Sequence, residues 1–279
     1  MTSRLFDTHT HFDVQDFDAD RQALAMQAYQ QGVHALVLIG FLQSRFADLR
    51  RTYQDMLDWQ RQHPQGAVPT PFLAPGLHPL YIEQHQTQHL ADLEQFLKSN
   101  DCVAIGEIGL DYFLPELKTT YSKQRQAEFF SAQLDLAKQY QKPVLLHIRR
   151  AHGDVLRILK QHKFTQGGIA HAFGGGAEEA KAFVKMGFKI GITGLITNPN
   201  AKKLQQVINH TTPQDWVIET DCPDMTPLCC QNSHERRTRN TPANLPYVLQ
   251  ALAEITKIAE QDLAQQLWQN SLACLNVKM

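Results

Sequence analysis

Short apolar runs alternate along the chain with longer segments in which apolar residues recur every three or four positions. The short runs are typical of buried strands and the longer segments of amphipathic helices. This pattern predicts strands at residues 5–9, 35–39, 70–75, 102–106, 143–147, 168–170, 188–192 and 216–219. Helices are expected between them, near residues 19–31, 44–63, 88–99, 122–140, 151–163, 177–186 and 200–209.

The last strand is followed by a polar loop, residues 224–240, and by two more helical segments near 242–256 and 260–274. Eight strand–helix units predict a TIM (β/α)8 barrel, an α/β fold, as a single domain over residues 1–279. A doubly wound open sheet is the alternative fold. We favour the closed barrel because its strand ends meet around one site, which the polar residues described below require.

Composition restricts the class of protein without naming a function. With 43% hydrophobic and 20% charged residues, the chain has the make-up of a globular protein. The N-terminus lacks a signal-peptide pattern and no apolar stretch approaches the roughly 20 residues that span a bilayer, so a cytoplasmic location without membrane contact is expected. Five cysteines at irregular spacing do not indicate a disulfide framework, and no interface pattern predicts a protein partner, so we expect a monomer.

Five of the expected strands end on residue types that bind metals. The candidates are His9, His11, Glu107, His147, His171 and Asp221. A lone histidine at a strand end is more often a core or capping residue than a ligand, but agreement at five strand ends favours a metal site at the mouth of the barrel. Imidazole and carboxylate ligands suit zinc, manganese or iron, and magnesium if oxygens dominate.

Strand geometry suggests how these ligands are shared. Side chains alternate between the two faces of a strand, so Asp7, His9 and His11 are expected to point into the barrel, and Phe6, Thr8 and Thr10 toward the helices. Two imidazoles and two carboxylates can hold one cation, and the two further imidazoles suggest a second. Glu107 is the expected bridge, because a buried carboxylate shared by two cations is well compensated.

Six segments in order along the chain resemble the TatD family of metal-dependent deoxyribonucleases, and two of them are closest to its YjjV-like branch. They start at Asp7-Thr8-His9-Thr10-His11, Gly76-Leu77-His78-Pro79, Gly106-Glu107, His147-Ile148-Arg149, His171-Ala172-Phe173 and Glu219-Thr220-Asp221-Cys222-Pro223. The resemblance implies two divalent cations, Mg, Mn or Zn. It assigns His9, His11 and Asp221 to one cation, His147 and His171 to the other, and Glu107 to both.

The reaction that this resemblance implies is hydrolysis of phosphodiesters at DNA ends by a metal-activated water, as in a 3′-5′ exodeoxyribonuclease. Asp221 and Glu107 are the expected catalytic residues, with Asp221 moving the proton of the water. The net charge of −1 excludes a broad DNA-coating surface, so the contacts with DNA ends or short single strands must be local. The family pattern and the position after the strands give His78, Arg149, Arg239 and Asn240 as substrate-binding residues.

Other groups around the expected mouth support a nucleic-acid substrate. Arg150, Arg236 and Arg237 add cations that can bind phosphate bidentately. The aromatic residues Tyr112, Phe113 and Phe173 are candidates either for stacking on a base or for packing the loops.

Two alternatives remain open. The same barrel and metals can hydrolyse esters, amides or lactones, because they also activate water toward a carbonyl carbon. A binding scaffold with a structural metal is the non-enzymatic alternative. An excess of His and carboxylate candidates disfavours it, because structural zinc sites are usually closed shells of four ligands, often cysteines.

Overall fold

The computed structural model describes residues 4–63, 67–232 and 237–279. Its strands run parallel and in chain order within two sheets, β1-β2-β3 and β4-β5-β6-β7-β8. They are β1 (Leu5–Thr10), β2 (Val33–Ile39), β3 (Thr70–Ala74), β4 (Ile105–Asp111), β5 (Val144–Arg149), β6 (Gly168–Ala170), β7 (Phe188–Ile192) and β8 (Trp216–Ile218). The alternation of apolar runs therefore located every expected strand.

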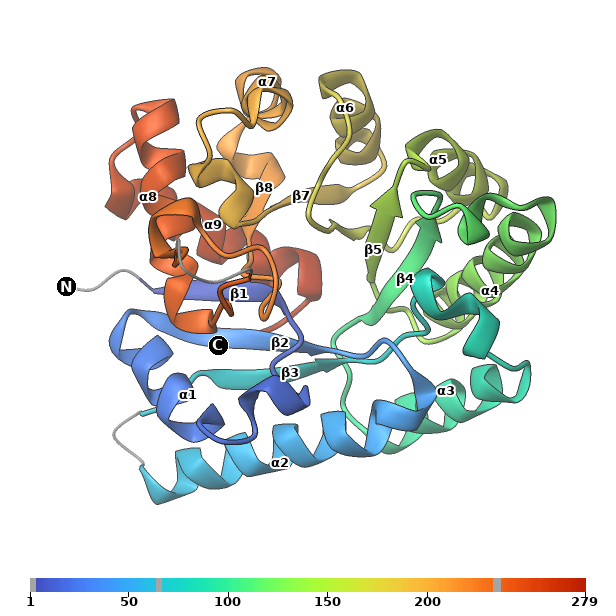
Figure 1. Cartoon of the computed structure of the whole chain (residues 1–279), viewed down its shortest axis with the longest axis horizontal. Helices are drawn as coiled ribbons and strands as arrows, with labels where there is room; N and C mark the ends of the chain where they lie inside the picture. The colour runs from blue at the N-terminus through green and yellow to red at the C-terminus, as the bar shows by residue number, and fades with distance from the viewer. Residues whose placement is uncertain (1–3, 64–66, 233–236) are drawn as a thin grey trace.

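Backbone hydrogen bonds join the two sheets at both seams. Between β3 and the start of β4, the N–H of Val103 donates to the carbonyl of Leu73 at 2.9 Å. Between β8 and β1, the N–H of Asp221 donates to the carbonyl of His9, also at 2.9 Å. Helices surround the strands (Figure 1). The fold is the expected TIM-barrel type of α/β structure.

The helices that connect and follow the strands agree with the expected segments to within three residues. They are α1 (Arg21–Gln30), α2 (Phe46–Gln62), α3 (Gln88–Ser99), α4 (Thr120–Gln139), α5 (His152–Gln161), α6 (Ala177–Lys185), α7 (Lys202–His210), α8 (Leu245–Thr256) and α9 (Glu260–Leu275). None of the helices formed by the described residues combines the length and apolarity needed to span a bilayer.

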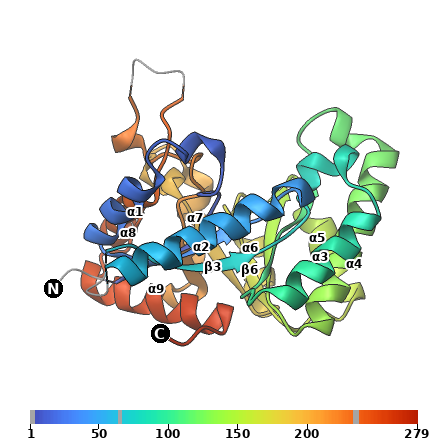
Figure 2. The same cartoon turned by 90° about the horizontal axis from the view of Figure 1, so that it is seen from below.

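The apolar core has an outer and an inner part. In β2, Leu36 and Leu38 join the outer core, whereas Val37 joins the inner cluster. From α9, Trp268 packs against this inner cluster, with its ring centroid 5.8 Å from that of Phe6. Figure 2 shows α9 (red) at the lower end of the molecule and the segment that precedes α8 (orange) at the upper end. Helix α9 thus covers one end of the barrel and leaves the other for the site.

Strand β1 departs from simple alternation, so the expected orientation of its first residues is wrong. Phe6 packs in the inner cluster, and the carboxylate of Asp7 accepts hydrogen bonds from the backbone N–H and hydroxyl of Thr220. Asp7 pairs with Leu36 and Thr10 with Leu38, so three steps along β1 correspond to two along β2. The extra residue is a β-bulge, which reverses the alternation between Phe6 and His9.

Candidate metal centre

Glu107 lies at the centre of the site and is 2% exposed. Strand β4 was expected to end at Gly106 but continues to Asp111, with a second bulge between Ile105 and Ile108. Bulges re-aim side chains next to active sites, and this one is at Glu107. Among the described residues, every ion pair of its carboxylate is with a histidine. A buried acid without Lys or Arg compensation is therefore the focus of the site.

Two histidines of β1 and its continuation face one oxygen of this carboxylate. The Nε2 atoms of His9 and His11 lie 3.2 and 3.4 Å from Glu107 Oε2, and both lie 3.8 Å from Asp221 Oδ1. His11 Nδ1 is 3.3 Å from the carbonyl of Ile39. If Nδ1 donates its hydrogen to this carbonyl, Nε2 keeps a free lone pair toward the carboxylates.

The other oxygen of Glu107 faces β5 and β6. His147 Nδ1 lies 2.8 Å from Glu107 Oε1, and His147 Nε2 lies 2.9 Å from Asp111 Oδ2. His171 Nε2 lies 3.9 Å from Glu107 Oε1 and 3.4 Å from Asp221 Oδ1. The four candidate imidazole ligands therefore surround the Glu107 carboxylate, and Asp221, the sixth candidate, lies against three of them.

Two buried acids behind the histidines were not among the expected site residues. Asp111 faces His147 as given above, and Glu219 Oε1 lies 2.8 Å from His171 Nδ1. Acids of this kind orient imidazole ligands and raise their basicity. Asp111 is four positions after Glu107 on the same strand, and Glu219 is two before Asp221. Residues an even number of positions apart share a face of a regular strand, so the spacing of Asp111 from Glu107 and of Glu219 from Asp221 could have indicated both acids.

Burial and the surrounding charges set the pKa values of this cluster. Burial opposes ionisation of Glu107, but the positive charge of the surrounding imidazoles, His171 among them, outweighs it and holds the pKa of Glu107 well below the usual range. Burial likewise opposes protonation of His147, yet hydrogen bonds to Asp111 and Glu107 raise its pKa to about 9. The cluster therefore stabilises positive charge between its carboxylates, the place where a cation would be held.

The donor set fits divalent cations. Ligand atoms of His9, His11 and Asp221 lie within 4.8 Å of one another, as do those of a group formed by His78, Glu107 and His147. Nitrogen and oxygen donors in such groups suit Zn, Mn or Fe. The left-handed backbone of Asp221, with φ of 55°, is held by the hydrogen bond to His9. A strained residue of this type is common at functional sites.

His78 lies beside Glu107 but is oriented as a donor. Its Nδ1 accepts the N–H of Leu80 at 2.9 Å, so in the neutral ring the hydrogen is on Nε2. This Nε2 lies 3.2 Å from Glu107 Oε1 and 3.0 Å from His147 Nδ1. Burial lowers the pKa of His78 to about 4, which keeps the ring neutral at physiological pH.

A cavity of about 730 Å³ opens above the cluster, and only some of the expected substrate-binding residues line it. His78, Arg149 and Arg237 line it. Arg239 and Asn240 do not, and Arg236 lies outside the described residues.

The other contacts of Arg239 and Asn240 explain their positions. The Arg239 guanidinium is paired with the Asp20 carboxylate, with contacts of 2.5 and 3.1 Å. Asn240 is 1% exposed and donates to the carbonyl of Thr220 at 2.9 Å. The structure gives both residues a role in fixing the chain before α8.

The aromatic residues expected at the mouth do not line the cavity. Phe173 is buried against Phe183, and the Phe113 ring is covered by the guanidinium of Arg149, 3.6 Å from its centroid. Tyr112 is 9% exposed. Phe41 and Tyr81 line the cavity instead, with ring centroids 5.5 Å apart. Phe113 and Phe173, the aromatic residues near the strand ends, therefore pack against neighbouring side chains of the protein.

Comparison with known proteins agrees with this geometry. The family described as TatD related DNase matches residues 6–276. The uncharacterized metal-dependent hydrolase YjjV of Escherichia coli (strain K12) is 34% identical over 282 residues, which cover 99% of this chain and 100% of that protein. The crystal structure of YjjV from Escherichia coli K12 matches 100% of both chains with a TM-score of 0.85.

A further relative is named as an exonuclease. It is the 3′-5′ ssDNA/RNA exonuclease TatD of Pantoea sp. (strain At-9b), 31% identical over 274 residues that cover 96% of this chain and 97% of that protein. With a family match over nearly the whole chain and relatives above 30% identity, the chain belongs to the TatD family and is a metal-dependent hydrolase.

Proposed function

We propose that this hydrolase is a deoxyribonuclease that removes nucleotides from DNA ends in the 3′ to 5′ direction. The observation that carries the proposal is the convergence of four candidate imidazole ligands on the Glu107 carboxylate, with Asp221 beside them, beneath a cavity lined by Arg149 and Arg237. The two guanidinium groups and the neutral hydrogen-bond donor His78 are groups that bind the oxygens of a phosphodiester. The exonuclease named among the relatives supports the same chemistry.

Two divalent cations fit this donor set. We assign His9, His11 and Asp221 to one, His147 and His171 to the other, and Glu107 to both. Bound there, such cations would lower the pKa of a water molecule and polarise a phosphoryl oxygen. Mg, Mn and Zn are all compatible with the ligands.

The chain's own residues supply proton transfer and binding. The Asp221 carboxylate is only partly exposed, and its pKa is held below the usual value because the nearby imidazoles of His171, His9 and His11 outweigh the effect of burial. It is therefore ionised and able to accept a proton from water in the cavity. His78 Nε2–H is placed to donate to a phosphoryl oxygen, and an uncharged donor does so without repelling the cations.

Two arginines bind the rest of the anion. Arg149 stacks on Phe113, and Arg237 forms an exposed ion pair with Asp224 at 2.7 Å. Both guanidinium groups border the cavity, where they can form bidentate contacts with phosphate oxygens. The contacts are local, as the nearly neutral net charge requires.

The test is cleavage of 5′-labelled single-stranded DNA by protein loaded with Mg²⁺ or Mn²⁺, beside an EDTA-treated sample and the variant Glu107→Ala. We expect stepwise shortening from the 3′ end that is lost in both controls. Glu254→Ala, which removes an exposed acid on α8, is the matched variant and should retain activity.

A stable, metal-loaded protein that releases no nucleotide would refute the nuclease proposal. Turnover of esters, amides or lactones by the same sample would then assign the site to carbonyl hydrolysis. Shortening from the 5′ end would refute the proposed polarity alone.

A further inference from the structure

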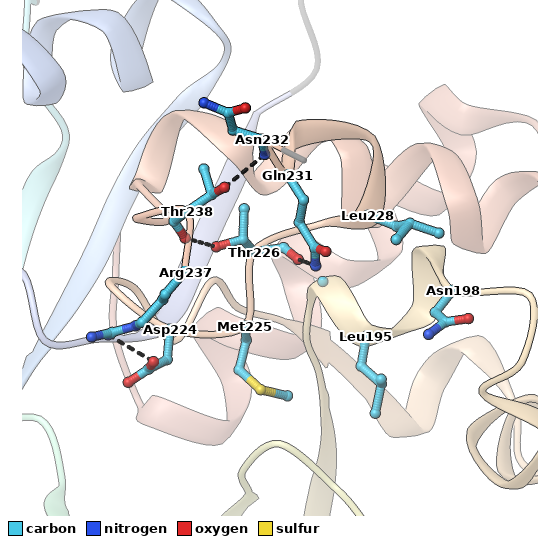
Figure 3. A pocket seen from close by; sticks show the side chains of 11 residues that line it. Leu195, Asn198, Asp224, Met225, Thr226, Leu228, Gln231, Asn232, Arg237 and Thr238 are labelled. Atoms are coloured by element: carbon cyan, nitrogen blue, oxygen red, sulfur yellow. Dashed lines mark hydrogen bonds and ion pairs between the residues drawn. The ribbon is translucent and has the colours of Figure 1, made fainter. Parts of the chain in front are cut away.

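A second cavity, of about 340 Å³, shares part of its lining with the cavity above the candidate metal centre. Figure 3 shows the residues that line it. It is bounded by the turn after β7, residues 194–198, and by residues 224–232 and 237–238, which lie between β8 and α8. Its lining includes Leu195 and Leu228, which are 42% and 46% exposed, and the thioether side chain of Met225. Exposed apolar side chains gathered at a cavity mark a binding site more often than a random surface.

Amide groups accompany these apolar side chains. Asn198, Gln231 and Asn232 line the same cavity, and the labelled side chains in Figure 3 come from both bounding segments. Apolar surface together with a few carboxamide groups is the lining expected for a planar heterocycle, because carboxamides can both donate to and accept from a base edge.

The walls of this cavity are held together by hydrogen bonds. The N–H of Leu228 donates to the hydroxyl of Thr197 at 2.7 Å, which ties the two segments to each other. Within the second segment, Thr226 donates to the carbonyl of Thr238 at 2.6 Å, and Gln231 donates to the carbonyl of Thr226 at 3.0 Å. The cavity is therefore preformed, which reduces the ordering cost of binding.

Three residues belong to the walls of both cavities: Asp224, Met225 and Arg237. Arg237 pairs with Asp224 at 2.7 Å, but their side chains are 54% and 63% exposed. An ion pair so exposed is weak, so the guanidinium can turn to an incoming phosphate at little cost. A DNA strand that runs from the metal centre toward the second cavity would thus contact the Arg237 guanidinium first and the apolar, amide-lined cavity next.

This order matches the order of groups in a nucleotide, phosphate and then base. We propose that the second cavity is a subsite for the base of the 3′-terminal nucleotide, which Leu195, Leu228 and Met225 contact. The inference rests on the proposed nuclease function and adds its recognition element. It predicts that a base at the scissile end accelerates cleavage beyond what the phosphodiester alone provides.

Two 5′-labelled single strands of one sequence test this, one ending in thymidine and the other in a tetrahydrofuran abasic residue. Wild type should release the thymidine nucleotide with a kcat/KM about fivefold to tenfold higher, the low end of the effect of one bound base. The double variant Leu195→Ala, Leu228→Ala should reduce this ratio to about one. Both side chains are exposed, so the variant should fold.

Tyr247→Ala is the control, because Tyr247 is 42% exposed on α8 and lines neither cavity. It should keep the wild-type ratio. Equal cleavage of both strands by wild type, or an unchanged ratio in the double variant, would overturn the base subsite while the nuclease function stands. Absence of metal-dependent cleavage of either strand and of bis(p-nitrophenyl) phosphate would instead remove the nuclease function on which the subsite rests.

Discussion

Replacing Asp111 by Asn tests whether the acids behind the histidines control the metal centre. Asp111 is 1% exposed; its Oδ2 lies 2.9 Å from His147 Nε2 and its Oδ1 accepts the N–H of Phe113 at 2.8 Å. Asparagine has nearly the same shape and can keep the bond to Phe113. The substitution therefore removes the negative charge behind His147 and little else.

The size of the effect follows from this contact. A buried hydrogen bond between an imidazole and a carboxylate is a charge-assisted one, worth about 1.5–3 kcal/mol. That energy corresponds to about a 10- to 100-fold change in a binding constant, the range found for acids behind metal-ligating histidines. We expect metal affinity and kcat/KM to fall by about this factor, because His147 loses both its orientation and part of its basicity.

The assay is competition for Zn²⁺ or Mn²⁺ against a chromophoric chelator, together with kcat/KM on bis(p-nitrophenyl) phosphate. The control is Asp135→Asn, because Asp135 also faces a histidine, His162 Nδ1, at 3.0 Å but is 64% exposed. It should change neither quantity. If Asp111→Asn is folded and keeps both within twofold of wild type, the supporting role of Asp111 is wrong.

Three further substitutions separate structural from functional residues. Arg239→Ala removes the pair with Asp20, so urea denaturation should show a loss of about 0.5–1 kcal/mol in stability, with an unchanged KM for short DNA. Trp268→Ala removes a large side chain from the inner cluster and leaves a cavity there. In the same denaturation assay the free energy of unfolding should fall by about 3–5 kcal/mol. Gly191→Ala would place a Cβ 2.3 Å from Glu219 Oε1. We therefore expect kcat/KM to fall more than tenfold, about 1.4 kcal/mol, with only a small change in melting temperature. If the fraction of folded protein falls by the same factor as kcat/KM, the effect is one of stability and the prediction is wrong.

The fold was largely predictable because its elements are local. Each strand is a short apolar run, and each helix an amphipathic segment whose period is visible in the sequence. Boundaries were less accurate where geometry differs from the ideal. Strand β4 begins and ends later than expected. It pairs with β5 from Ile105 to Asp111, and a bulge at Glu107 interrupts the register without ending the pairing.

For the candidate site, the sequence predicted which residues would lie close together better than it predicted their surroundings. His9, His11 and Glu107 were recognisable because metal-ligand types at several strand ends must meet in a closed barrel. The role of Arg239 was not, because its pairing with Asp20 joins residues 219 positions apart. For the aromatic residues near the strands the sequence left base stacking and loop packing open, and the cavity is lined by Phe41 and Tyr81 instead.

The sequence by itself therefore determined the barrel, the family and the set of candidate ligands, since these depend on residue type and on periodicity along the chain. Only the tertiary structure decided which atoms face one another. One extra residue in β1 turns Asp7 to Thr220 and leaves His9 and His11 on the side of Glu107. A bulge changes the face of every residue after it without changing composition or hydrophobic pattern, because it arises from pairing with the neighbouring strand.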